Sequence, residues 1–241
     1  MIKTIIKTAL ITSCLASMAA ASAGGHATKK NDPWGVKFGY VHTNLNNHFR
    51  YDSSSDAGAS NSNRNTGHES LNGVLLGVDY RVDCKDHLFY GFELLASKGF
   101  SDKEFENYDS AKDRYQIINQ FSLRPSVVVG SRFDRMNLYA KFGVNASRNK
   151  IEREGWAANT LTRFYKTDET KMFYGPSIGV GTEVDFGKNL VAFAEYNYSY
   201  LLKTKLKNVT YTNGDGDVVT YANTKIKLDD NSFMLGLKYS F

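Results

Sequence analysis

Apolar residues recur at every second position in most of the chain after residue 33. A period of two is typical of a β-strand with one apolar face, whereas an amphipathic helix repeats every 3.6 residues. In the first segment the alternation sets Trp34, Val36, Phe38 and Tyr40 against Gly35, Lys37, Gly39 and Val41. The pattern predicts eight strands, within residues 34–41, 74–81, 88–97, 115–129, 138–146, 172–186, 190–200 and 233–241. Within 115–129 it places Ile117 and Phe121 on the same apolar face.

The connections between these segments alternate between short and long. Short ones lie at 82–87, 130–135 and 187–189, and long polar ones at 44–70, 100–112, 149–169 and 203–230. The consistent face of the segments is apolar, and the opposite face carries Gly, Ser, Asn and charged residues. These features together are typical of an antiparallel transmembrane β-barrel. We expect this architecture over residues 33–241, with both termini on the side of the short turns.

The last long connection is itself patterned. Residues 206–212 and 218–228 alternate and flank a strong hairpin-turn signal made of Asn213, Gly214, Asp215, Gly216 and Asp217. We interpret the flanks as the seventh and eighth strands continuing beyond the membrane. A ten-stranded barrel is the alternative interpretation.

The N-terminus has the features of a targeting signal. Residues 1–7 carry two lysines, residues 8–20 are apolar or small, and Ala21 and Ala23 form a small-x-small cleavage site. This pattern predicts a secretory signal peptide over residues 1–23.

A short segment, 24–32, would then precede the barrel. Cys14 lies in a sequence that resembles a lipoprotein cleavage box, but the apolar run before it would be very short. After cleavage at residue 23, Cys84 is the one remaining cysteine, so the mature chain is expected to form no internal disulfide.

Composition narrows the class of protein further. The 241 residues are 41% hydrophobic with a mean hydropathy of −0.42, which excludes a bundle of membrane-spanning helices but not a barrel. The formal net charge of +5 is small and scattered, so we expect no nucleic-acid partner.

The polar faces of the predicted strands carry five basic and five acidic residues, namely Lys37, Asp79, Arg81, Glu93, Arg124, Lys141, Glu183, Asp185, Glu195 and Lys238. An eight-stranded barrel is only wide enough for side chains to fill it. Because an unpaired buried charge is costly, these groups should pair and close the lumen. We expect Glu93 to face Arg124, and Glu183 and Glu195 to be neighbours flanked by Lys141 and Lys238. A narrow path for ions or protons is the alternative.

Enzyme chemistry has little support in the sequence. His42 and His87 fall at opposite ends of the predicted strands, so they cannot form one site. His48 and His68 lie in the first long connection and could meet, but two loop histidines are a weak metal signal. We expect no catalytic residues, no metal site and no cofactor.

The C-terminal segment alternates aromatic and aliphatic residues up to a terminal phenylalanine, at positions Phe233, Leu235, Leu237, Tyr239 and Phe241. It resembles the assembly signal of Gram-negative outer-membrane proteins. Residues 175–198 resemble the penultimate strands of the small OmpA, OmpX and opacity-type barrels. The resemblance implies an outer-membrane location, insertion by the barrel-assembly machinery, and a role in envelope integrity or adhesion rather than catalysis. A small porin or narrow ion channel is the alternative function.

The long connections are rich in basic residues, which include Arg50, Arg64, Arg148, Lys150, Arg153, Arg163, Lys203, Lys205, Lys207, Lys225 and Lys227. Positive surface charge attracts anionic partners. We expect contact with membrane lipid and lipopolysaccharide, or adhesion to host surfaces and extracellular polyanions.

Overall fold

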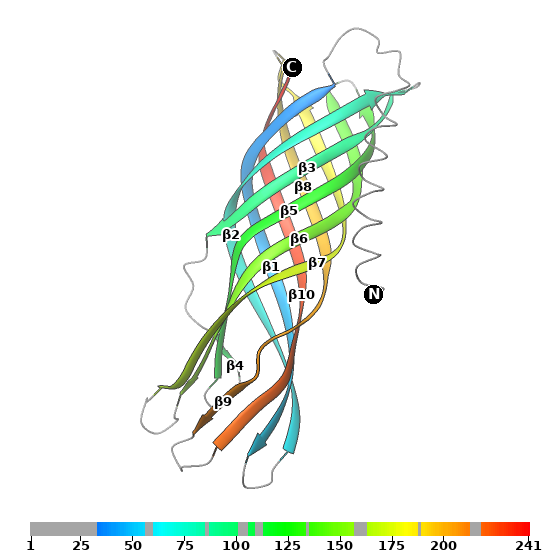
Figure 1. Cartoon of the computed structure of the whole chain (residues 1–241). Coiled ribbons are helices and arrows are strands. Elements are labelled where there is room, and N and C mark those ends of the chain that lie inside the picture. The colour runs from blue at the N-terminus through cyan, green and yellow to red at the C-terminus, as the bar shows by residue number, and fades with distance from the viewer. Residues whose placement is uncertain are drawn as a thin grey trace.

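Eight long antiparallel strands form a closed ring in the computed structural model (Figure 1). They are β1 (Trp34–Ser55), β2 (Ser60–Asp83), β3 (Leu88–Phe100), β5 (Asp113–Phe133), β6 (Met136–Trp156), β7 (Arg163–Asp185), β8 (Leu190–Lys205) and β10 (Val218–Ser240). The structure describes residues 33–55, 60–84, 87–100, 106–108, 113–133, 135–156, 163–187, 189–212 and 218–241. The predicted signal peptide and the segment 24–32 lie outside these ranges. In the described part of the chain, no helix is long and apolar enough to cross a membrane.

The ring closes between its first and last strands, where Gly35 of β1 is in register with Ser240 of β10. Two further strands, β4 (Glu106–Tyr108) and β9 (Val209–Thr212), are short and pair with β5 and β10 outside the ring. The predicted eight-stranded barrel is therefore confirmed. The ten-stranded alternative is wrong, because neither short strand enters the ring.

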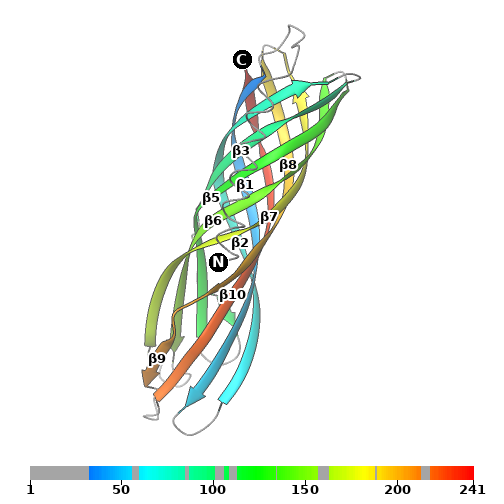
Figure 2. The same cartoon turned by 45° about the vertical axis from the view of Figure 1, so that its right-hand side comes forward.

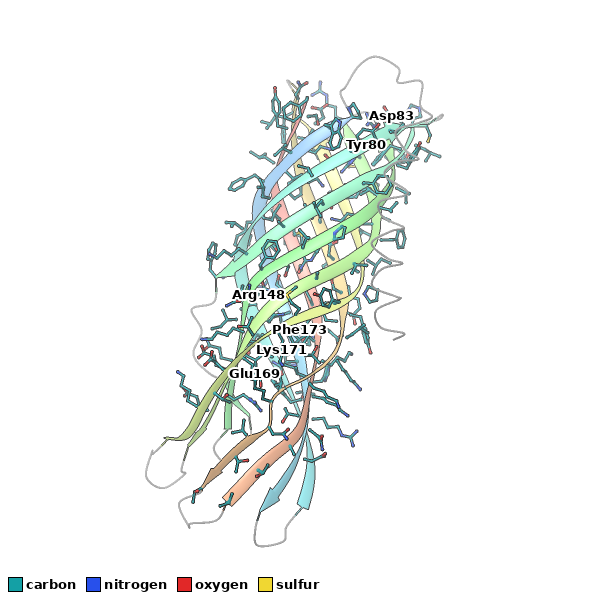
Figure 3. All side chains as sticks on the ribbon, in the orientation of Figure 1. Tyr80, Asp83, Arg148, Glu169, Lys171 and Phe173 are labelled. Atoms are coloured by element: carbon teal, nitrogen blue, oxygen red, sulfur yellow. The ribbon has the colours of Figure 1, made fainter. Side chains whose placement is uncertain are left out.

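Near the end that holds both Trp34 and the C-terminus, the barrel is apolar outside and charged inside. Phe38 is 63% exposed on the outer face, whereas its neighbour Lys37 is completely buried in the interior. Figure 3 shows Tyr80 and Asp83 at this end of the barrel. The outer band includes Trp34, Val36, Tyr40, Leu76, Val78, Leu94, Val127, Phe142, Ile178, Val180, Tyr196, Leu235 and Leu237.

The polarity of the two faces reverses part of the way along the strands that continue furthest from this end, as β1 shows. On β1 the outer face changes from apolar to polar after Tyr40, while Val41, Leu45 and Phe49 fill the interior. A strand surrounded by lipid hides its polar groups inside, and one surrounded by water hides its apolar groups inside. We call the second part of the barrel the extension; on β1 it follows Tyr40, from where the apolar residues face the interior. Residues 44–70 and 149–169 were expected to be loops, and this expectation is wrong, because most of both ranges is strand in the extension.

The extension is split into two sheets that pack face to face. The β7–β8 ladder ends at Ser177 and Ser199, the β3–β5 ladder at Ser97 and Ser122, and the β2–β3 ladder at Asn72 and Phe100. The ladders β1–β2, β1–β10, β8–β10, β5–β6 and β6–β7 continue. Figures 1 and 2 show β6 and β7 leaning away from β1 and β10 at this end. One sheet thus contains β2, β1, β10 and β8, and the other contains β5, β6 and β7.

An apolar core lies between the two sheets of the extension. The first sheet and the segment after β8 contribute Leu45, Phe49, Leu71, Leu201, Leu206, Ile226 and Leu228. The second sheet contributes Ile117, Ile151 and Phe173. The extension is thus built like a soluble sandwich, continuous with a membrane barrel.

One face assignment in β5 is wrong. A register shift against β6 between Asn119 and Phe121 marks a β-bulge. Because the extra residue reverses the alternation, Ile117 is fully buried inside the barrel while Phe121 is 42% exposed outside it.

Candidate functional site

Four charged side chains from four strands form a closed ring inside the barrel. Lys37 of β1 and Lys141 of β6 alternate with Glu93 of β3 and Glu195 of β8. The Lys37 ammonium lies 2.6 Å from Glu195 Oε1 and also contacts Glu93. Lys141 lies 2.5 Å from Glu93 Oε1 and also contacts Glu195. Each carboxylate is therefore held between two ammonium groups.

A second group of charged side chains lies beside this ring, nearer the end of the barrel that holds the C-terminus. Arg81 binds Glu183 through two hydrogen bonds of 2.7 Å each, and its Nε lies 2.8 Å from Asp79. Lys238 lies 2.9 Å from Glu183 and 3.3 Å from Asp79. The 3.6 Å contact between Lys37 and Glu183 joins the two sets. Together the eight groups are four cations and four carboxylates, so the joined cluster is neutral.

Aromatic rings complete the packing around these charges. The Tyr139 hydroxyl donates a 2.6 Å hydrogen bond to Glu195. Lys37 lies 4.9 Å from the centre of the Phe193 ring, and the Arg81 guanidinium lies 4.8 Å from that of Tyr139. At Gly181 a Cβ atom would lie 2.5 Å from the Tyr139 ring, so this position must lack a side chain. Tyr139 was absent from the predicted set, although its alternation with Lys141 would have placed it inside.

Arg124 does not face Glu93, so this part of the prediction is wrong. In the β3–β5 ladder Glu93 is opposite Ser126, and Arg124 lies two residues further along. Arg124 instead donates hydrogen bonds to Asp230 at 2.7 Å and to Ser232 at 2.8 Å. Asp230 was missed because it falls at the end of a segment that we expected to be a loop.

Asp185 also lies apart from the interior cluster. It is exposed at the end of β7, where its carboxylate accepts a 2.7 Å hydrogen bond from the Gly187 amide. Gly187 has a φ of +82°, which favours glycine, so the two residues shape the turn to β8. The other nine predicted interior charges are buried, and the eight other than Arg124 form the joined cluster.

Two groups of apolar side chains pack in the interior together with the charged cluster. Phe89, Val128 and Tyr139 form one group, and the other contains Val41, Leu75, Leu95, Phe193 and Met234. The Arg124–Asp230 pair and the core of the extension lie further along the strands. The interior of the barrel is thus packed, and the clustered charges in it have partners.

Polar contacts close the two gaps between the sheets of the extension. At one gap the Glu69 carboxylate accepts hydrogen bonds of 2.9 and 3.1 Å from the Ile117 amide. At the other, Glu169 accepts a 2.5 Å bond from the Lys207 amide, and Arg153 donates a 2.9 Å bond to the Lys207 carbonyl. Figure 3 shows Glu169 near Phe173, where the extension begins.

The histidines and the cysteine in the described ranges do not form a site. His42 and His68 each lie within hydrogen-bond distance of an asparagine, and His48 lies 3.5 Å from Asp229. Across the described ranges, no three His, Cys, Asp or Glu side chains are grouped to hold a metal ion. Cys84 is a free, exposed thiol.

A closed antiparallel ring with an apolar outer band and a charged interior defines a transmembrane β-barrel. The sequence profile of the outer membrane protein beta-barrel domain family matches residues 9–241, and the chain belongs to this family. The protein is therefore located in the outer membrane of a Gram-negative bacterium, as predicted. The predicted resemblance to small outer-membrane barrels is also confirmed.

Two solved structures share the fold at low sequence identity. The outer membrane protease OmpT from Escherichia coli is 11% identical with a TM-score of 0.50, over 89% of this chain and 99% of that one. The outer membrane protein OprG from Pseudomonas aeruginosa is 13% identical with a TM-score of 0.51, over 90% of this chain and 98% of that one. A comparison with curated protein sequences found no match.

Proposed function

We propose that this protein is a non-catalytic surface barrel with a closed lumen, which serves envelope integrity, adhesion or both through its extension. The observation that carries the proposal is the neutral cluster of four cations and four carboxylates that fills the barrel together with packed apolar side chains. A filled interior of this kind stabilises the barrel and leaves no continuous aqueous path. The protein would then act through the surfaces that it presents outside the membrane.

The absence of catalysis is part of the proposal. His42, His48 and His68 contact amide or carboxylate oxygens, and in the described ranges no histidine is bonded to a serine or cysteine that it could activate. The fold shared with the protease OmpT supports no activity here, because 11% identity reflects architecture alone.

A small porin or narrow channel is the second candidate, favoured by the line of ionisable groups along the lumen. Single-channel recording in planar bilayers separates the two. We expect no stable conductance from the folded wild type, and the same result from a Lys98→Ala control on the outer face of β3. A stable, large conductance that a lumen-directed blocker abolishes would overturn the closed barrel.

The cellular role needs a separate test. In a deletion strain, loss of resistance to detergents and bile salts would support envelope integrity, and loss of cell binding would support adhesion. We also propose that the C-terminal strand directs insertion by the barrel-assembly machinery. Its residues Phe233, Leu235, Leu237, Tyr239 and Phe241 are all exposed and apolar, as a docking signal requires.

A further inference from the structure

Basic side chains from three adjacent strands lie in one row on the outside of the extension. Arg50 of β1 is in register with Lys225 of β10, and Lys225 is in register with Lys205 of β8. All three side chains are exposed, as is Lys203 on β8. Because neighbouring strands are about 4.8 Å apart, the row brings three cations within roughly 10 Å. Like charges in directly opposed positions destabilise a sheet, so the row has a structural cost.

We call the outer surface of β1, β10 and β8 in the extension the basic face. Its described cations are Arg50, Lys203, Lys205, Lys225 and Lys227, and its carboxylates are Asp52 and Asp229. Asp229 is engaged by Lys227 at 2.9 Å and by His48 at 3.5 Å, and Asp52 accepts a 3.4 Å bond from the Asn223 amide. Five cations against two carboxylates leave an excess of three positive charges.

The outer face of β6 and β7 in the extension also carries several charged side chains, but there the cations and carboxylates balance. Its described charges are Arg148, Lys150 and Lys166 against Glu152, Glu154 and Asp168, which sum to zero. Lys150 lies 2.5 Å from Glu152, and Lys166 lies 3.1 Å from Glu154. The hydrogen bond to Glu152 raises the pKa of Lys150 above its ordinary value of 10.5. The basic face forms no equivalent pairs between Arg50, Lys203, Lys205 or Lys225 and a described carboxylate.

The basic face begins where the apolar outer band ends. On β8 the outward residues Tyr198, Tyr200 and Leu202 are exposed, and Lys203 follows directly. The Lys227 ammonium lies 4.1 Å from the centre of the Tyr200 ring, at the same boundary. A ligand for this surface would therefore present its negative charges immediately above hydrocarbon.

We propose that the basic face binds the phosphorylated headgroup of an outer-leaflet glycolipid, the chemistry of the diphosphoryl lipid A of lipopolysaccharide. Two phosphates can each contact more than one cation of the row, while the acyl chains lie against the apolar band of β8 and β10. The inference rests on the proposed function, because it requires the extension to stand outside the outer leaflet. It deepens that proposal by assigning one face and one ligand chemistry.

Diphosphoryl lipid A is titrated into the folded mature protein in a non-ionic detergent, and binding is followed by native mass spectrometry. The test variant is the triple Lys203→Gln, Lys205→Gln and Lys225→Gln. The control is the triple Arg148→Gln, Lys150→Gln and Lys166→Gln, which removes the same charge from the other face. Monophosphoryl lipid A with the same acyl chains tests the role of the second phosphate, and heparin tests a soluble polyanion.

Each cation at an anionic lipid surface contributes about fivefold in affinity, so the test triple should weaken binding on the order of 100-fold. The control triple should change it little, and monophosphoryl lipid A should bind more weakly to the wild type. Without lipid, Lys225→Gln should leave the unfolding temperature unchanged or raise it, because it removes repulsion within the row.

Three results would overturn the inference: equal losses in both triples, equal affinity for the two lipids, or binding of heparin without lipid A. Failure of the closed-lumen proposal can be told apart from failure of this inference. A conducting wild-type barrel would leave the lipid titration unchanged, since the basic face lies outside the lumen.

Discussion

Replacement of Lys37 by methionine tests whether the interior charges are as tightly coupled as their geometry indicates. The Lys37 ammonium contacts Glu93, lies 2.6 Å from Glu195 and lies 3.6 Å from Glu183. Methionine has a similar volume but no charge, so three cations would remain against four carboxylates. Removal of one partner from a buried, paired cluster costs about 3–5 kcal/mol, because a charge is left uncompensated.

A second variant separates lost charge balance from lost packing. Lys37→Met combined with Glu195→Gln leaves three cations and three carboxylates in the cluster. Replacement of a whole buried pair by uncharged groups of similar size is often close to neutral, so most of the lost stability should return. The control is Lys98→Met on the exposed face of β3, which should cost less than about 0.5 kcal/mol.

The assay is equilibrium unfolding in urea of the barrel folded into phosphatidylcholine vesicles. Fluorescence of the two tryptophans reports unfolding, and gel migration checks that each variant inserts. The reasoning is refuted if Lys37→Met alone costs less than about 1 kcal/mol, or if the double variant is no more stable than the single one. Either result would mean that water, rather than side chains, compensates the interior charges.

Two further predictions concern the extension. Phe173 is completely buried, so Phe173→Ala should cost about 3–5 kcal/mol and make the extension sensitive to protease while the membrane part stays folded. The half-exposed neighbour Met172 is the control, and equal protease resistance in Phe173→Ala and wild type would contradict the packed core. Glu69→Gln removes a charged acceptor worth about 1.5–3 kcal/mol, so amide exchange at Ile117 should accelerate roughly 10- to 100-fold. An unchanged exchange rate there would show that the gap between the sheets is closed by other contacts.

Much of the membrane part could be predicted because its rule is local. Phe38 faces outward and Lys37 inward simply because successive residues of a strand point to opposite faces. The same rule, combined with alternating short and long connections, was enough to predict an eight-stranded barrel. It also identified nine of the buried interior charges before any contact was known.

The same rule did not predict the extension, because the surroundings of the strands change along their length. Apolar residues on β1 shift from even to odd positions between Tyr40 and Val41, where the surroundings of the strand change from lipid to water. Apolar and polar residues still alternate there, but the outer face is now the polar one. Such a segment resembles a polar loop in sequence, so it was predicted to be one. In β5 the apolar residues keep the same parity, but the bulge after Asn119 reverses the face to which that parity belongs, so Ile117 was placed on the wrong face.

The pairing of the charges depended on the whole barrel. Lys37 meets Glu93 and Glu195 across sequence separations of 56 and 158 residues, and Arg124 meets Asp230 rather than Glu93. The alternation of residues determined which side chains enter the lumen, because that depends on one strand at a time. Their partners were decided by the closed tertiary structure alone, since the stagger of all eight strands sets the depth at which each side chain meets another.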